Sequence, residues 1–147
     1  MGKNILLPSA SLVKRLGALT YDLMAVSALC FMVSALWVIG LNGGEAITKT
    51  HPYYPYMQAS FPLTGLLFFL FFWLREGQTL GMRAWRIQVQ HKEGGKITLI
   101  QALTRAGVAV ISFATLGLGY FWQLLPPAKK SWHDRASNTI VVQLPKY

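Results

Sequence analysis

Long apolar runs separated by short polar stretches dominate this chain. The first run covers residues 16–41, and Asp22 is its only charged residue. A helix of this length extends about 39 Å at about 1.5 Å per residue, which exceeds the hydrocarbon core of about 30 Å. Asn42-Gly43-Gly44 follows and is typical of a helix end. The pattern predicts a membrane-spanning helix over this run.

The second apolar run covers residues 61–74, and three tyrosines lie just before it, within residues 53–56. Tyr and Trp favour the boundary between water and lipid, so this stretch predicts the entrance to a second span. Prolines also occur here, the last of them Pro62. We expect them to lie in the preceding loop or in the first helical turn, where a missing N–H is tolerated.

The third apolar run covers residues 106–125 and remains uncharged as far as Ala128. Leu116-Gly117-Leu118-Gly119 interrupts it, and prolines at 126 and 127 end it. Either this run is a third full span, or it is re-entrant or broken and turns near Gly117–Gly119. An irregular turn within the bilayer must be buried against protein.

The distribution of Lys and Arg bears on that choice. Three precede the first run, one lies between the first and second runs, six lie between the second and third, and four follow the third. The positive-inside rule places all the segments that are rich in Lys and Arg in the cytoplasm. Three full spans would put the tail outside, so we favour a re-entrant or broken third segment.

The spacing of apolar residues changes after the second run. Residues 85–90 alternate between apolar and polar side chains, which predicts a strand. Residues 91–96 contain Gly94-Gly95 and predict a turn, after which Ile97-Thr98-Leu99 is expected to return as a second strand. Residues 139–144 also have strand composition and are a further candidate partner. The sequence therefore predicts a small β-ribbon at the membrane surface.

Composition supports a single membrane domain over residues 1–147. Hydrophobic residues make up 53% and charged residues 13%, against about 25% charged residues in soluble domains. The formal charge of +9 favours an anionic membrane surface over nucleic acid, because no recognition motif accompanies it. The one cysteine, Cys30, excludes an intramolecular disulfide, and we expect no cleavable signal peptide, cofactor or metal site.

Asp22 is the most informative residue of the first run. A carboxylate in an apolar helix is costly and usually has a partner. Arg15 lies seven residues earlier on the same helical face, with a Cα separation of about 10 Å. Arg105, at the start of the third run, is the alternative partner. Asp22 lies close to one end of its run, so it fits both a structural pair and a transport role.

His133 and Asp134 are neighbours in the sequence, and we expect them to lie on a loop. Adjacency does not make a catalytic triad or a set of metal ligands, and no suitably spaced His/Glu pair accompanies it. The chain also offers no nucleophile with a base at a usable spacing and no phosphate-binding glycine loop before a helix. We therefore expect that the protein is not an enzyme.

Three motifs occur in order along the chain: RLGALTYD at residues 15–22, GQTLGMR at 77–83 and HDRASNTIVV at 133–142. They resemble the motifs of the RDD family of bacterial membrane proteins, which is named for an arginine and two aspartates. Met82 departs from a position that is commonly basic in the family. Ser137-Asn138 also differs from the usual small pair, but neither change affects the name-giving charges.

The resemblance implies a multi-pass protein of the cytoplasmic (inner) membrane, and it implies little biochemistry. We expect a charged cluster, functional or structural, near the cytoplasmic face and a signature turn after the second span. The main expectation is ion or small-solute transport, and the alternative is an assembly module. Expected partners are the lipid bilayer and either further copies of the chain or other membrane proteins. The expected cluster is Arg15, Asp22, Arg105, Asp134 and Arg135, and the expected signature residues are Gly77, Gln78, Thr79, Gly81 and Arg83.

Overall fold

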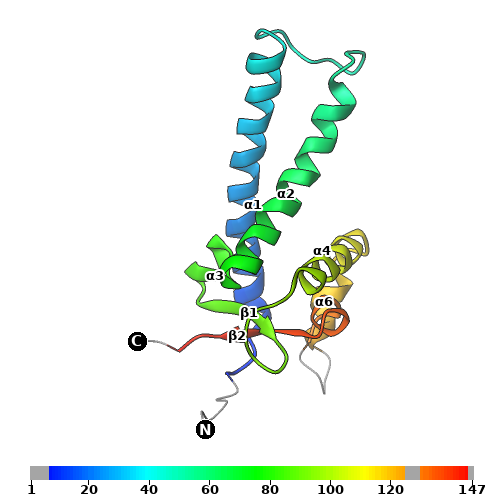
Figure 1. The fold of residues 1–147 in the computed structure, drawn as a ribbon. Coiled ribbons are helices and arrows are strands. Elements are labelled where there is room, and N and C mark those ends of the chain that lie inside the picture. Colours follow the sequence, from blue (N-terminus) through cyan, green and yellow to red (C-terminus); the bar gives the residue numbers. More distant parts are fainter. Residues whose placement is uncertain (1–6, 125–129, 146–147) are drawn as a thin grey trace.

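The computed structural model describes residues 7–124 and 130–145, and it is mainly helical (Figure 1). Two long helices form a hairpin, and the shorter elements gather at one end of it. We call this end the base. In chain order the elements are α1 (Leu12–Ala35), η1 (Leu36–Leu41), α2 (Tyr54–Glu76), α3 (Leu80–Ala84), β1 (Ile87–His91), α4 (Leu99–Ala114), α5 (Leu118–Phe121), η2 (Trp122–Leu124), α6 (Trp132–Ala136) and β2 (Thr139–Gln143).

The first predicted span is confirmed as a continuous helical rod, α1 followed by the π-helical turns of η1. It ends at Asn42, and Gly43 and Gly44 follow with φ angles of 64° and 92°. These left-handed angles are easily adopted by glycine, which explains why the helix stops there. The sequence did not predict the π-helical stretch.

The second predicted span begins earlier than expected, at Tyr54 instead of near residue 61. The expectation for the last proline was wrong, because Pro62 lies inside α2 and not in its first turn. The hydrogen bond that Pro62 cannot donate is the one to the carbonyl of Gln58. Near the tip of the hairpin, Trp37 Nε1 donates to Ser60 Oγ at 3.2 Å and joins the two helices.

Within the described residues, two helices are long and apolar enough to cross a membrane: the rod of 30 residues over Leu12–Leu41, and α2. No residue in the most apolar 18-residue stretch of the rod is buried, and 11% of the residues in the corresponding stretch of α2 are. The core helix of a soluble protein would be mostly buried. Large side chains such as Phe31 and Met32 are exposed instead, as expected for helices that face lipid.

The third apolar run forms a helix that begins earlier than expected and then breaks. Thr98 starts α4 with a capping box, in which its hydroxyl accepts from the Gln101 backbone while the Gln101 side chain accepts from the Thr98 backbone. The helix ends at Ala114, and Leu116 and Gly117 adopt φ angles of 56° and 79°. A break near Gly117 is thus present as predicted. The predicted end of the run, residues 125–128, lies outside the described residues.

The small sheet pairs β1 with β2 in antiparallel register, with Val89 opposite Val141. The further candidate partner, residues 139–144, is therefore confirmed. The predicted hairpin with residues 97–99 is wrong, because the Gly94-Gly95 turn leads into the cap of α4 and not into a strand. Ile97 packs in the core at the base.

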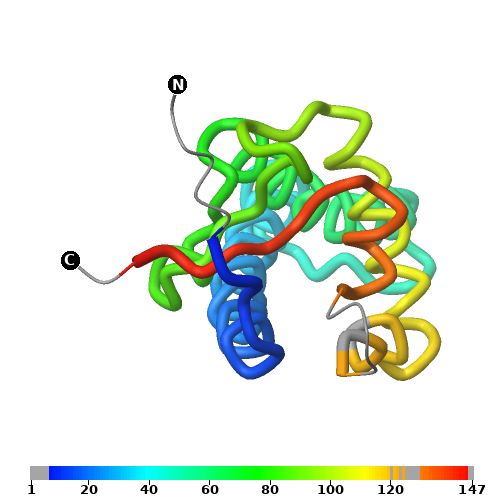
Figure 2. The backbone as a smooth tube through the Cα atoms, turned by 90° about the horizontal axis from the view of Figure 1, so that it is seen from below, coloured from blue at the N-terminus to red at the C-terminus, as the bar shows by residue number. Residues whose placement is uncertain are grey.

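The base joins three distant parts of the chain. Ala10 N donates to Val141 O at 2.9 Å, and Gln143 N donates to Pro8 O at 2.8 Å, so the segment before α1 lies beside β2. Figure 2, seen from below, shows β2 crossing the lower end of α1. The buried hydrophobic core lies at this base and includes Ala18, Trp73, Ile87 and Val141. The packing therefore fixes the start of α1, the segment after α2 and the C-terminal strand relative to one another.

Candidate functional site

Asp22 is held by the segment that follows α2. Its side chain is 1% exposed. Thr79 Oγ1 donates to Asp22 Oδ2 at 2.5 Å, and the backbone N–H of Gly81 donates to Asp22 Oδ1 at 2.8 Å. We call these three residues the Asp22 cradle. Hydrogen bonds to a carboxylate are about twice as strong as neutral ones, so the cradle offsets part of the cost of burying this group.

The expectation that Asp22 pairs with Arg15 or Arg105 is wrong. In the part of the chain that the structure describes, Asp22 forms no ion pair. Thr79 is the N-cap of α3, and its hydroxyl also accepts from Met82 N at 3.2 Å. One threonine therefore starts a short helix and donates to a carboxylate 57 positions earlier.

Glycines of the signature segment allow this close approach. A Cβ atom on Gly81 would lie 2.0 Å from the backbone oxygen of Ala18, so only glycine lets α3 pack against α1. Gly77 ends α2 with a φ of 69°, and a Cβ there would lie 2.6 Å from Val89 O. Gln78 Nε2 donates to Ile87 O at 2.8 Å. The signature turn thus includes the short helix α3, which the sequence did not predict.

A second cluster forms around Asp134, and we call Arg15, Arg105 and Asp134 the Asp134 cluster. Arg15 Nη1 lies 2.5 Å from Asp134 Oδ2, and Arg105 Nη1 lies 2.6 Å from Asp134 Oδ1. The side chains of all three are at most 5% exposed. One carboxylate from α6 therefore joins guanidiniums from α1 and α4.

Hydroxyl groups complete the surroundings of the Asp134 cluster. Arg105 Nη1 also donates to Thr139 Oγ1 at 2.6 Å. Ser137 and Thr139 share a hydrogen bond of 2.7 Å between their hydroxyls. Arg105 lies over the ring of Trp73, with 5.3 Å between Cζ and the ring centroid, which is favourable cation–π geometry.

Burial raises the pKa of the Asp134 carboxyl, but the guanidiniums of Arg105 and Arg15 outweigh burial and hold that pKa well below its usual value. His133 lies beside it on α6, which corrects the expectation of a loop. Burial, reinforced by the charge of Arg105, lowers the pKa of His133 to about 3. Its Nε2 lies 2.9 Å from Ser131 Oγ. His133 is therefore neutral at physiological pH, and Asp134 is ionised.

Two predicted residues lie outside both groups. Arg135 points to solvent from α6, and the structure shows no ion pair between it and any described residue; its expected place in the cluster is wrong. Arg83 is half exposed and pairs with Glu76 at the end of α2. Both arginines are thus surface charges at the base.

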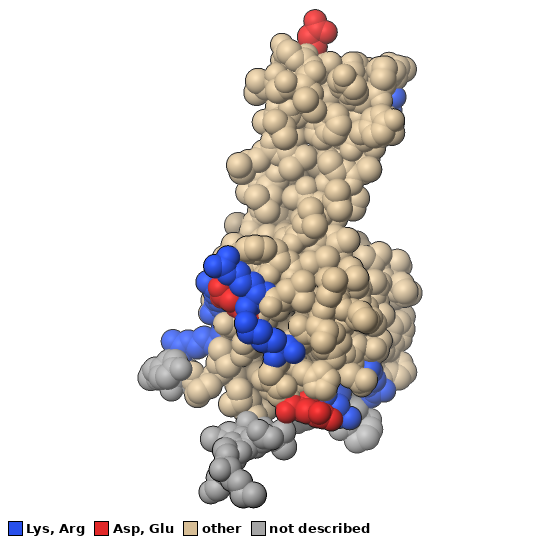
Figure 3. Space-filling model, viewed as in Figure 1, with Lys and Arg blue, Asp and Glu red and all other residues tan. Residues whose placement is uncertain are grey.

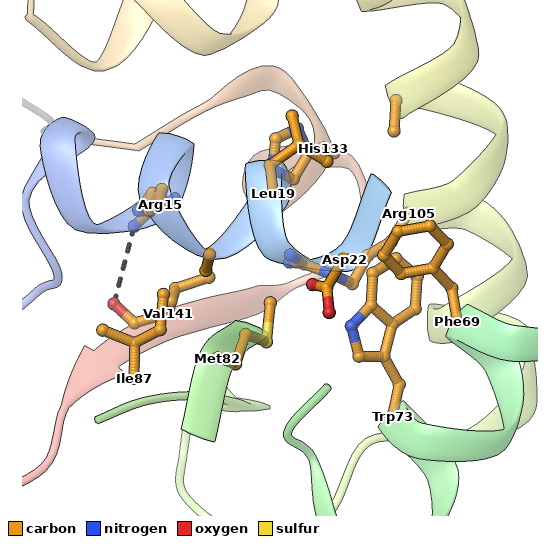
Figure 4. Close-up of a pocket in the computed structure, with 12 residues that line it drawn as sticks. Arg15, Leu19, Asp22, Phe69, Trp73, Met82, Ile87, Arg105, His133 and Val141 are labelled. Carbon is orange, nitrogen blue, oxygen red and sulfur yellow. Dashed lines mark hydrogen bonds between the residues drawn. The ribbon is translucent and has the colours of Figure 1, made fainter. Parts of the chain in front are cut away.

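A cavity of about 50 Å³ separates the Asp22 cradle from the Asp134 cluster. Asp22, Arg15, Arg105 and His133 contribute its charged and polar lining, and apolar side chains complete it (Figure 4). All five expected cluster residues therefore lie at the base, and four of them, all except Arg135, are buried there. Asp22 and the Asp134 cluster remain two separately bonded groups.

Several partners were missed by sequence reasoning. The sequence indicates that Thr79 can cap a helix, because threonine is a common N-cap residue. It does not indicate the hydrogen bond to Asp22, because the two residues are 57 positions apart. Thr139 was marked only as a member of the third motif, and Trp73 had no signal. The described residues contain no group of three or more His, Cys, Asp or Glu side chains that could hold a metal ion. The geometry offers buried, hydrogen-bonded charges beside a small cavity.

Comparison with known proteins agrees with the three motifs. The family model described as the RDD family matches residues 9–138. No curated protein and no solved structure gives a match. The matched range includes Arg15, Asp22, the signature turn and Asp134. The family and the two apolar helices together indicate a membrane protein in contact with the lipid bilayer. Because the match covers most of the chain, this protein belongs to the RDD family.

Proposed function

We propose that the protein carries an ion or a small solute across the cytoplasmic membrane, with Asp22 as the exchanging group. The observation that carries this proposal is the position of Asp22: it is buried and borders a cavity together with Arg15 and Arg105. Ionisable residues on membrane-spanning helices are costly and typically belong to ion or substrate pathways.

Helix lengths support a place for Asp22 at one membrane boundary. From Asp22 to Leu41 the helical rod rises about 28 Å at about 1.5 Å per residue, close to the thickness of a hydrocarbon core. A bilayer that begins just beyond Asp22 therefore ends at the tip of the hairpin. The Asp22 cradle then lies where the membrane meets the base, close to one aqueous side.

The sheet supports a topology with two crossings. Because β1 pairs with β2, and the segment before α1 lies beside β2, all three lie on one side of the membrane. The 16 residues of α4 rise about 24 Å, less than a full crossing. The break at Gly117 returns the chain to α6 at the base. The third apolar run is thus a re-entrant or interfacial segment in this proposal.

Charge supports a cytoplasmic base. On the face shown in Figure 3, charged side chains gather at the base, and the hairpin above it is free of them up to its tip. Thirteen of the fourteen Lys and Arg residues lie outside the segment between α1 and α2, which holds only Lys49. By the positive-inside rule the base faces the cytoplasm.

Two crossing helices cannot enclose a pathway by themselves, so we propose that several copies assemble. The exposed apolar face of α1, which includes Phe31 and Met32, is available for lipid or for a neighbouring copy. The oligomer follows from this geometry and is part of the proposal.

Flux through proteoliposomes tests the proposal. We expect Asp22→Asn to abolish flux, because the amide still accepts from Gly81 but cannot carry a charge. Glu93→Gln makes the same chemical change at an exposed acid and serves as the matched control. Proton, sodium and potassium flux are measured with ion-sensitive dyes, and thermal unfolding checks folding. Flux at the wild-type level in folded Asp22→Asn contradicts the proposal. Absence of flux of all three ions above empty liposomes in the wild-type protein contradicts transport of these ions.

A second candidate is a structural module that assembles with other membrane proteins. The observation that favours it is the Asp134 cluster, whose charges are buried and paired within the chain, as in a rigid scaffold. It predicts a partner that co-purifies in mild detergent and is lost when the β1–β2 ribbon is altered. A single partner-free species at native expression would count against it.

A further inference from the structure

Among the buried hydrogen-bond donors that lack an acceptor in the described residues, two lie at the cavity. One is the indole Nε1 of Trp73, which is 7% exposed, and the other is Nε of Arg105, which is 2% exposed. A buried donor without an acceptor costs about 1–3 kcal/mol, so each such group calls for an explanation.

Both residues line the cavity between the Asp22 cradle and the Asp134 cluster. Figure 4 shows the indole nitrogen of Trp73 on the side that faces Asp22. The cavity volume of about 50 Å³ exceeds the 10–15 Å³ that one water requires on this measure. Donors, acceptors and space therefore meet at one place.

The chemistry of the lining selects the ligand. An anion would accept from the Trp73 indole but would face the Asp22 carboxylate. A cation would be attracted to Asp22 but would face the guanidiniums of Arg15 and Arg105 and two N–H donors. Water can accept from an indole N–H and donate to a carboxylate at the same time. Asp22 has capacity for this, because a carboxylate offers about four acceptor sites and the cradle uses two.

We propose that this cavity is a permanent water site, in which ordered water accepts from Trp73 Nε1 and donates to Asp22. The same water layer reaches Arg105 and so connects the Asp22 cradle with the Asp134 cluster. The site does not depend on transport: it satisfies buried donors whether or not a solute moves. Apolar neighbours such as Phe69 and Ala109 confine the water to the polar side of the cavity.

Indole ¹⁵N NMR in detergent micelles tests this site. We expect the Trp73 Nε1–H signal, identified by its loss in Trp73→Phe, to show a direct cross-peak to water and a hydrogen-bonded chemical shift. Trp37 is the internal control, since its Nε1 donates to Ser60 Oγ and should show no water cross-peak. If Trp73→Phe does not fold, variants at the other four tryptophans identify the signal by elimination.

Two results for the wild-type protein would overturn the proposal. The first is a Trp73 signal without a water cross-peak, which would mean that the cavity is dry. The second is a shift of that signal on chloride titration at constant ionic strength, which would mean that an anion occupies the site. Ala109→Val adds two methyl groups to the lining and should expel the water. A cross-peak that persists unchanged in this variant would also contradict the proposed location.

Discussion

The contact between α3 and α1 gives the sharpest stability prediction. In Gly81→Ala the new Cβ would meet the backbone oxygen of Ala18 at 2.0 Å, whereas ordinary contacts begin at 3.4 Å. The backbone fixes the position of this Cβ, and the Ala18 oxygen is itself helical backbone, so no side-chain rotation can relieve the contact. The two helices must separate by about 1.4 Å, the difference between these distances. That movement stretches the 2.8 Å hydrogen bond from Gly81 to Asp22 beyond its useful range.

The magnitude follows from two costs and one gain. Overpacking costs about 1–3 kcal/mol, and loss of a hydrogen bond to a charged group costs about 1.5–3 kcal/mol. Replacing glycine by alanine restricts the unfolded chain and returns about 0.4–1 kcal/mol. We therefore expect Gly81→Ala to lower the free energy of unfolding by about 2–5 kcal/mol.

Equilibrium unfolding in mixed detergent micelles measures this difference. Gly107→Ala is the matched control, because Gly107 lies in α4 with nothing within 4 Å of the added Cβ. There the substitution should leave stability unchanged or raise it by about 0.5–1 kcal/mol. A Gly81→Ala protein as stable as the wild type would refute the proposed packing of the Asp22 cradle.

Two further predictions concern α6. Asp134→Asn leaves two buried guanidiniums without their carboxylate and should lower the free energy of unfolding by about 3–5 kcal/mol in the same assay. The control Glu93→Gln should change it by less than about 0.5 kcal/mol. Equal effects of the two substitutions would contradict the Asp134 cluster. Because the pKa of His133 falls from 6.5 to about 3 on folding, the unfolded chain binds the extra proton between these pH values. Stability should therefore fall as pH drops through this window, by up to about 1.4 kcal/mol per unit. His133→Gln should remove that part of the slope, and an unchanged slope would contradict the buried neutral imidazole.

The apolar pattern was enough to predict the long helices, since their length and composition directly reflect a lipid environment. The break near Gly117 was also readable, because Gly117 and Gly119 interrupt an otherwise uniformly apolar run. The partner of β1 was harder to assign. The turn at Gly94-Gly95 pointed to a local hairpin, whereas Thr98 and Gln101 form a capping box that starts a helix. That box was visible in the sequence and would have excluded the hairpin.

The bonding of the charges could not be read from spacing along one helix. Arg15 and Asp22 share a face of α1, but the structure assigns them to different partners because α3 and α6 approach that face from distant parts of the chain. Every residue except proline has a backbone N–H, so the residue type of Gly81 does not indicate that its N–H donates to a carboxylate. Only the family resemblance had singled out residues 77–83, and it predicted a turn there without indicating what the turn contacts.

The central claim is that the chain crosses the membrane twice and that the β1–β2 ribbon lies on the cytoplasmic side. Labelling of single cysteines with a membrane-impermeant maleimide tests it, in a Cys30→Ala background. In intact cells we predict labelling of Glu45→Cys at the hairpin tip, and labelling of Glu93→Cys and Ala136→Cys only after permeabilisation. Labelling of Ala136→Cys but not Glu93→Cys in intact cells would show that the third apolar run crosses, and would contradict the account.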